Sequence, residues 1–338
     1  MAQPVKNTTL LDKLTAPLRG FLAQDGVTEV VVNKPFEIGV ETRSGWTWHK
    51  EPSLDFAALS AIATTAAAFT SQDVGEAAPI CSTNLPTGER LQIVLPPTVE
   101  AGTVSLTIRK PSNVTYSLQD FKNAGLFNDT AVAINAISKV EIDLLALLAA
   151  HDHTGFFDLA VKTKRNILIS GATGSGKTTF AKGLIALIPE YERLLTIEDT
   201  RELMMPHRNV VHMIYSKDGQ GTASVSAKQL LESALRMRPD RILLAELRDG
   251  TAYHYLRNVN SGHPGSITTV HADSAKLAFE QLTLLVKESD GGSDLARDDI
   301  RAMLTALVDI VVQIKKTDVG FRVTEIHYDP QARYVGAH

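Results

Sequence analysis

The sequence predicts an α/β fold in two parts, a smaller mixed α/β domain followed by a larger domain built on a mostly parallel sheet. Three observations lead to this prediction. Short apolar strands alternate with helical stretches after residue 138. A complete glycine-rich pattern, residues 171–178, joins one of these strands to an amphipathic helix. The 338 residues are also enough for two domains, and 44% apolar and 21% charged residues are typical of a soluble globular protein.

The first part, residues 1–110, has the pattern of a mixed α/β domain. Residues 1–20 resemble a short helical lead-in, after which the apolar positions change to the pattern of strands. The longest apolar stretch, 56–69, is too short for a membrane span and contains Ser60, so it predicts a packed helix. The predicted strands are 27–33, 36–42, 46–48, 90–95 and 103–109, and the predicted helix covers 54–70.

A change of composition separates the two parts. Residues 111–137 are punctuated by proline, serine, asparagine and glycine, with one short helix near 118–123, and they predict an interdomain linker. Ser138 and Glu141 form a capping box, so a helix begins the second domain, residues 138–338. Strands are predicted at 167–170, 194–198, 210–215, 242–246 and 267–271, with a closing antiparallel hairpin at 310–314 and 321–327.

The bulk composition narrows the classes of function. The net charge is −4, so no global basic field indicates a nucleic-acid partner. Cys81 is the single cysteine, which excludes an intramolecular disulfide and a zinc site that needs several thiolates from one chain. The first residues lack the apolar core of a secretory signal, and a reducing compartment is consistent with these features.

The glycine-rich pattern is the strongest chemical signal in the chain. Gly171, Gly174, Gly176, Lys177 and Thr178 fill every fixed position of G-x-x-x-x-G-K-[ST]. Glycines let successive backbone N–H groups point into one concavity that holds phosphate oxygens, and the following helix directs its positive end at the same anion. Lys177 is expected to reach the outer phosphates, and the Thr178 hydroxyl is expected to bind Mg²⁺. The flanking strand and helix argue against a glycine turn that matches by chance.

Two predicted strands run into carboxylates. The first ends at Glu246, and at the carboxyl edge of such a sheet a carboxylate can hold the Mg²⁺ shell or orient water. The second, 194–198, continues into Asp199 and Glu202, whose charges repel each other unless a cation or hydrogen-bond donors compensate. A solvated acidic turn is the structural alternative for this stretch. The glycine-rich loop upstream favours a role in handling metal or water.

A histidine and two arginines supply further candidate groups. His271 follows the last predicted parallel strand and is expected at the same sheet edge as Glu246. A neutral imidazole there can donate to a γ-phosphate. Arg236 and Arg238 precede the strand that ends at Glu246, and either can reach phosphate. A capping histidine and surface ion pairs are the structural alternatives.

Taken in this order, the motifs resemble those of the secretion ATPase superfamily. The glycine-rich loop corresponds to Walker A, residues 196–202 to the Asp box, the strand before Glu246 to Walker B, and residues 261–273 to the His box. The lack of a cysteine array and the short N-terminal domain make the chain more similar to the hexameric traffic ATPases of bacterial type IV secretion systems than to pilus or type II secretion members. The resemblance covers residues 20–330.

The resemblance implies a RecA-like P-loop fold for the C-terminal domain, a homohexameric ring, and Mg²⁺-dependent ATP hydrolysis with nucleotide between the two domains of one subunit. By motif match, Glu202 would activate water, Glu246 would be the Walker B acid and a metal ligand beside Thr178, and His271 would sense the γ-phosphate. Whether Glu202 or Glu246 is the base stays open. Lys177 and Arg238 complete the implied catalytic set. The implied ATP-binding residues are Gly171, Ala172, Thr173, Gly174, Ser175, Gly176, Lys177, Thr178 and Thr179, with Arg90 and Arg109 from the N-terminal domain.

The resemblance also implies a cytoplasmic protein in peripheral contact with inner-membrane components of a secretion complex, without sequence-specific binding of nucleic acid. Such a ring would power assembly of the apparatus or pilus, or transfer of a protein or DNA–protein substrate. Two other functions stay open. A RecA-like DNA-translocating or helicase-type motor needs a basic channel or stacking aromatics, which the sequence does not clearly show. A nucleotide-gated scaffold would hardly turn over, and the intact carboxylates and His271 argue against it.

Overall fold

The N-terminal part of the chain forms one antiparallel sheet with helices on one face. The structure is a computed structural model that describes residues 8–112, 114–130, 136–216, 221–248 and 250–332. The six strands lie in the order β3-β2-β1-β6-β5-β4. The strands are β1 (Glu29–Val32), β2 (Glu37–Thr42), β3 (Gly45–Lys50), β4 (Ile80–Asn84), β5 (Arg90–Val94) and β6 (Ser105–Arg109), and the helices are α1 (Thr9–Leu14), α2 (Ala16–Leu22) and α3 (Phe56–Phe69).

The predicted packed helix is confirmed as α3. The Asp55 side chain accepts a hydrogen bond from the Ala58 N–H at 2.7 Å and so caps its first turn. One stripe of α3 buries Leu59 and Ile62 against the sheet, together with apolar residues of α1 and α2. Strand β4 was not predicted, because Ile-Cys-Ser-Thr-Asn has too few apolar positions to show an alternating pattern.

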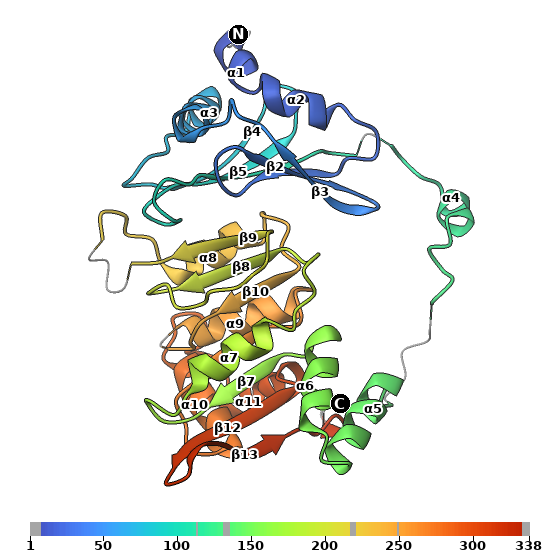
Figure 1. Cartoon of the computed structure of the whole chain (residues 1–338), viewed down its shortest axis with the longest axis vertical. Helices are drawn as coiled ribbons and strands as arrows, with labels where there is room; N and C mark the ends of the chain where they lie inside the picture. The colour runs from blue at the N-terminus through green and yellow to red at the C-terminus, as the bar shows by residue number, and fades with distance from the viewer. Residues whose placement is uncertain (1–7, 113, 131–135, 217–220, 249, 333–338) are drawn as a thin grey trace.

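A long connection leads from β6 to the second part of the chain. The helix in the described part of this connection, α4 (Leu118–Asn123), matches the prediction, and a capping box of Ser117 and Asp120 begins it. None of its residues is buried, and in Figure 1 it stands apart from both sheets. None of the helices in the described ranges has the length and apolar character that crossing a membrane requires.

The C-terminal part is the predicted mostly parallel sheet with helices on both faces. Its strands fall into two hydrogen-bonded groups, β10-β8-β9 and β11-β7-β12-β13. The Leu247 N–H donates to the Thr269 carbonyl at 2.8 Å and so links the two groups just beyond β10. All pairs are parallel except the closing β12–β13 hairpin. The strands are β7 (Ile167–Ser170), β8 (Leu194–Glu198), β9 (Val210–Ile214), β10 (Arg241–Leu244), β11 (Ile267–Val270), β12 (Ile310–Thr317) and β13 (Gly320–His327).

Two hydrophobic cores hold the helices on opposite faces of this sheet. One core joins the sheet to the first three helices, and the other joins it to the last four. Figure 1 shows the phosphate-loop helix α7 on the side of α5 and α6. The first set is α5 (Lys139–Ala149), α6 (His153–Lys162) and α7 (Lys177–Ile185), and the second is α8 (Ala227–Ala234), α9 (Thr251–Asn260), α10 (Ala275–Lys287) and α11 (Arg297–Leu307).

A buried arginine joins the two sheets where the N-terminal sheet lies over β8 and β9 (Figure 1). Arg193 has no exposed surface and donates to Asn33 Oδ1 at 2.8 Å and Thr107 Oγ1 at 3.2 Å in the N-terminal sheet. It also donates to Asn209 Oδ1 and to the Met237 carbonyl in the C-terminal part. Burial lowers the pKa of Arg193 to about 10. This value is still well above neutral pH, so the guanidinium stays charged.

Candidate nucleotide site

The glycine-rich loop connects β7 to α7 in the geometry that its sequence predicts. Gly174 and Gly176 have φ angles of 72° and 91°, the left-handed region that favours glycine. A Cβ on Gly171 would lie 2.5 Å from both the Ile314 carbonyl oxygen and Ser175 Oγ, so only glycine fits there. The helix begins at Lys177, and its first N–H groups therefore face the loop.

Lys177 is buried inside this loop. Its Nζ donates to the Gly171 carbonyl at 2.8 Å and the Ala172 carbonyl at 3.0 Å, and lies 3.3 Å from His271 Nδ1. Burial lowers the pKa of Lys177, although the nearby Glu246 carboxylate acts in the opposite direction. The ammonium thus lies within the loop, between two of its carbonyl groups and His271.

A cavity of about 670 Å³ opens beside the loop and the start of α7. Thr178 and Thr179 line one wall, and Phe321 and Arg322 of the β12–β13 hairpin line the other. Ser175 Oγ is buried and has no hydrogen-bond partner among the described residues. A closely fitted glycine cradle with an unpaired hydroxyl suits a ligand rich in acceptor oxygens, so the residues present fit a nucleotide phosphate.

Glu246 and His271 meet at the carboxyl edge of the sheet, as predicted. The strand β10 ends at Leu244, two residues earlier than predicted, so Glu246 projects from the loop that follows. His271 Nε2 lies 2.8 Å from Glu246 Oε1, and Arg248 forms ion pairs with both Glu246 and Asp199. Lys177, His271 and Glu246 therefore form one continuous polar chain beside the loop.

The acidic stretch after β8 is organised by Glu198 rather than by Glu202. Burial alone would raise the pKa of Glu198, but hydrogen bonds from His212, the Leu203 and Glu202 backbone N–H groups and Thr196 outweigh it, and the pKa is lowered. Both backbone N–H groups lie 2.8 Å from Glu198 Oε2. The Glu202 side chain is exposed, and it is not among the residues that line the cavity of the phosphate loop.

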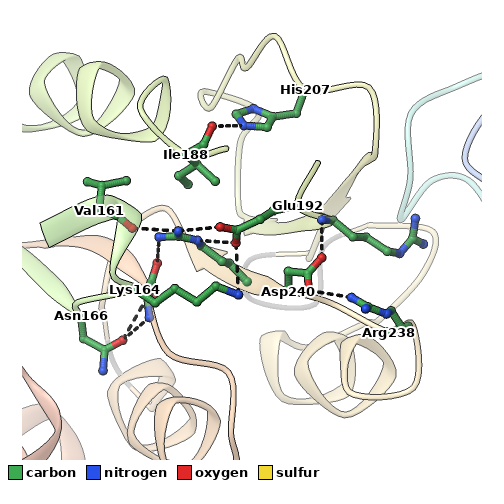
Figure 2. Close-up of polar contacts among 12 residues, drawn as sticks. Val161, Lys164, Asn166, Ile188, Glu192, His207, Arg238 and Asp240 are labelled. Carbon is green, nitrogen blue, oxygen red and sulfur yellow. Dashed lines mark hydrogen bonds and ion pairs between the residues drawn. The ribbon is translucent and has the colours of Figure 1, made fainter. Parts of the chain in front are cut away.

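Three predicted arginines lie in a second cavity, which we call the arginine cavity. Arg90, Arg109 and Arg238 line it with Glu29 and Glu41, and its volume is about 570 Å³. Arg238 precedes β10 and therefore lies at the amino edge of the sheet, opposite the phosphate loop. Figure 2 shows its guanidinium turned toward Asp240, at 2.6 Å. Within one chain, none of these arginines lines the cavity of the phosphate loop.

The same edge contains a buried ionic cluster that sequence reasoning did not identify. Arg241 is fully buried and donates to both Glu192 oxygens at 2.8 and 2.9 Å and to the Val161 carbonyl. Asn166, labelled in Figure 2, accepts hydrogen bonds from the N–H groups of Gly265 and Ser266. The cluster ties the starts of β7, β10 and β11 together and so fixes the strands that carry the site.

Other site residues were also missed. The hairpin residues Phe321 and Arg322 belong to no motif, and only the fold brings them to the loop. Arg248 could have been predicted from the sequence, because a cation two residues after a site carboxylate is placed to pair with it. Thr251 is the first residue of α9, and its hydroxyl accepts a hydrogen bond from the Arg248 N–H at 2.9 Å.

The model of the family described as "Type II/IV secretion system protein" matches residues 14–319. This chain belongs to that type II/IV secretion family. Its relatives include the type IV secretion system protein VirB11 of Bartonella henselae, 53% identical over 93% of this chain and 91% of the relative. VirB11 of Brucella suis is 42% identical over 97% and 93%. The crystal structure of the Brucella suis VirB11 ATPase in complex with sulphate superposes with a TM-score of 0.91, covering 97% of this chain and 100% of that chain at 41% identity.

These findings confirm the predicted resemblance to the type IV secretion ATPases and the predicted fold class, a RecA-like P-loop part with a smaller mixed α/β part before it. The chain is an ATPase of the type II/IV secretion family.

Proposed function

We propose that this ATPase works as a Mg²⁺-dependent homohexameric ring in a type IV secretion system. The observation that carries the proposal is the glycine loop with Lys177, His271 and Glu246 gathered beside it at one sheet edge. Such a site acts through preorganised charge: backbone N–H groups and Lys177 hold the phosphates, and little covalent chemistry is required of the protein. Glu202 or Glu246 supplies the base that orients water.

The metal ligands follow from the same geometry. Mg²⁺, when bound, would neutralise charge on the β- and γ-phosphates. Thr178, which lines the cavity, and Glu246 are the residues we assign to hold it. No group of three acidic, histidine or cysteine side chains able to hold a metal occurs in the described parts of the chain. Mg²⁺ is commonly held by one or two protein oxygens together with the substrate phosphates.

We also propose that the arginine cavity of one copy completes the phosphate loop of its neighbour in the ring. The earlier expectation placed nucleotide between the two domains of one subunit. In one chain, however, Arg193 and the Gln92–Ser233 hydrogen bond of 2.9 Å hold the N-terminal sheet away from the loop. A hinge motion would have to break these buried contacts. A heterologous ring contact brings Arg90, Arg109 and Arg238 to a loop without breaking them.

The remaining proposals concern organisation and partners. We propose residues 1–110 and 138–338 as the two domains and 111–137 as their linker. The ring would associate peripherally with inner-membrane components of the secretion complex on its cytoplasmic face. We expect it to power apparatus or pilus assembly, or transfer of a protein or DNA–protein substrate, without sequence-specific binding of DNA.

Light scattering combined with phosphate release tests the proposal. The purified protein is measured with Mg-ATP, with ATP plus chelator, and without nucleotide. A hexamer that releases phosphate only with Mg²⁺ agrees with the proposal, whereas a monomer under all three conditions refutes the ring. A gel shift with single- and double-stranded DNA at physiological salt tests the alternative DNA motor, because tight binding there would favour it.

A further inference from the structure

A groove between α8 and α9 contains groups that nucleotide chemistry does not use. It has a volume of about 210 Å³, which suits one or two side chains of a ligand. Each helix contributes one face, with residues at helical spacings of three, four or seven. The groups that matter are Lys228 and Glu232 on α8, Leu235 at its C-cap, and His254, Arg257 and Asn258 on α9.

The two cations in this groove are exposed and unpaired. In the part of the chain that the structure describes, neither Lys228 nor Arg257 forms an ion pair, although Glu232 lines the same groove. The neighbouring pair of helices behaves differently, because Arg297 and Arg301 both pair with Glu280 between α10 and α11. The α8–α9 groove therefore presents cations whose hydrogen-bond donors are available to a ligand.

A buried amide provides the second, independent observation. Asn258 is 3% exposed and lines the groove, yet neither its side-chain nitrogen nor its oxygen has a hydrogen-bond partner among the described residues. Native proteins seldom leave a buried amide unsatisfied, so such a group needs an explanation. An amide side chain offers a donor and an acceptor together, which match the C=O and N–H of a peptide backbone. Both atoms are buried here, so a ligand meets them only after the Asn258 side chain turns into the groove.

The electrostatic balance inside the groove is positive. His254 is half-buried there, and its pKa is lowered by burial first and then by Lys228 and Arg257. Glu232 acts in the opposite direction but is outweighed. A capping box of Ser226 and Gln229 fixes the start of α8, so the cations stand on a preformed scaffold.

We propose that the α8–α9 groove docks an acidic segment of a partner protein. A carboxylate of that segment pairs with Lys228 and Arg257, and an adjacent apolar side chain covers Leu235. Its backbone amide meets Asn258 once that side chain has turned into the groove. A charge-assisted pair at a partly enclosed site supplies affinity that an isolated surface ion pair lacks. This docking goes beyond the proposed ATPase function and does not rest on it.

The test uses a fluorescent peptide, acetyl-Gly-Glu-Leu-Glu-Gly-amide, and its Gln-for-Glu counterpart, titrated with the full-length protein and followed by anisotropy. We expect the acidic peptide to bind at least about tenfold more tightly than the neutral one. The double variant Lys228→Ala/Arg257→Ala should lose this difference and keep wild-type phosphate release with Mg-ATP. The control Lys50→Ala/Lys122→Ala removes the same charge from exposed positions elsewhere and should bind like the wild type.

Asn258→Ala separates docking from a structural role. Replacing an unsatisfied buried amide need not destabilise the fold, so we expect a near-normal melting temperature with peptide affinity lowered at least about threefold. Equal binding of both peptides by the wild type, or unchanged binding by the Lys228→Ala/Arg257→Ala variant, overturns the proposal. Loss of the ring in that double variant also overturns it, because the groove would then be an interface between copies of this chain.

Discussion

The phosphate-loop cavity and the arginine cavity both contain cationic side chains, but they are assembled in opposite ways. The first depends on one continuous stretch, residues 174–183, closed by a hairpin. The second gathers Arg90, Arg109 and Arg238 from three strand ends, and buried acids lie among them. The first cavity presents backbone N–H groups and one lysine. The second presents arginine side chains that only the tertiary structure brings together. Our proposal is that they supply different halves of one reaction.

The Lys177→Ala variant tests whether the phosphate loop depends on its one lysine. The loop holds phosphate through its backbone, and the ammonium is the only side-chain charge we assign to it. We expect kcat for ATP to fall about a thousandfold while the far-UV circular dichroism stays unchanged. Lys182→Ala, on the same helix, is the matched control and should keep its activity. Near wild-type phosphate release by Lys177→Ala would remove the phosphate-loop assignment.

Arg193→Leu tests whether the arginine cavity is fixed to its own chain. Removing a buried guanidinium leaves Asn33, Thr107 and the Met237 carbonyl without their donor. We expect a loss of about 3 kcal/mol in the free energy of unfolding measured in urea. Arg236→Leu is the control, because its exposed hydrogen bond to Ser82 spans the same interface and should contribute under about 1 kcal/mol. Equal losses would show that the interface is not centred on Arg193.

The variants Glu202→Gln and Glu246→Gln decide which of the two carboxylates acts as the base. An amide keeps the size of the carboxylate but cannot accept a proton at neutral pH. We expect Glu202→Gln to bind ATP normally and to hydrolyse it about a hundredfold more slowly. Nucleotide affinity and single-turnover rates are measured for both variants. If only Glu246→Gln shows this pattern, the base is Glu246.

The smallest expected effect concerns pH and Glu29 in the arginine cavity. Burial raises the pKa of Glu29 to about 7, although Arg109, 3.6 Å away, opposes the shift. The folded state therefore holds this proton more tightly than the unfolded chain, and the stability it contributes is lost as pH rises through 7. Glu29→Gln cannot lose the proton, so between pH 5 and pH 8 it should lose less stability than the wild type, by on the order of 2 kcal/mol. The free energy of unfolding is measured in urea at each pH. If it falls equally with pH in the two proteins, the burial of Glu29 has no energetic consequence.

The contrast between the two cavities also explains what the sequence could predict. Local patterns identified the glycine loop, the helix α3 and the alternating strands of the C-terminal sheet, because each depends on neighbouring residues. Strand β4 was not predicted, because its sequence lacks an apolar alternation. The contribution of Phe321 to the cavity wall was not predicted either, because the hairpin reaches the loop only through tertiary packing. The position of Arg109 could not be predicted either, because it depends on how the two sheets pack.

Mixing two inactive variants tests the central claim, that the cavities are halves of one site shared between copies. Lys177→Ala removes the loop half and Arg109→Ala removes the arginine half. If each site takes its loop from one copy and its arginines from the next, a random equal mixture restores about a quarter of the sites. Replacing the second partner with Lys177→Ala/Arg109→Ala provides the control without recovery. Phosphate release near a quarter of the wild-type rate is the predicted result, and a mixture no more active than its components would place both halves in the same chain.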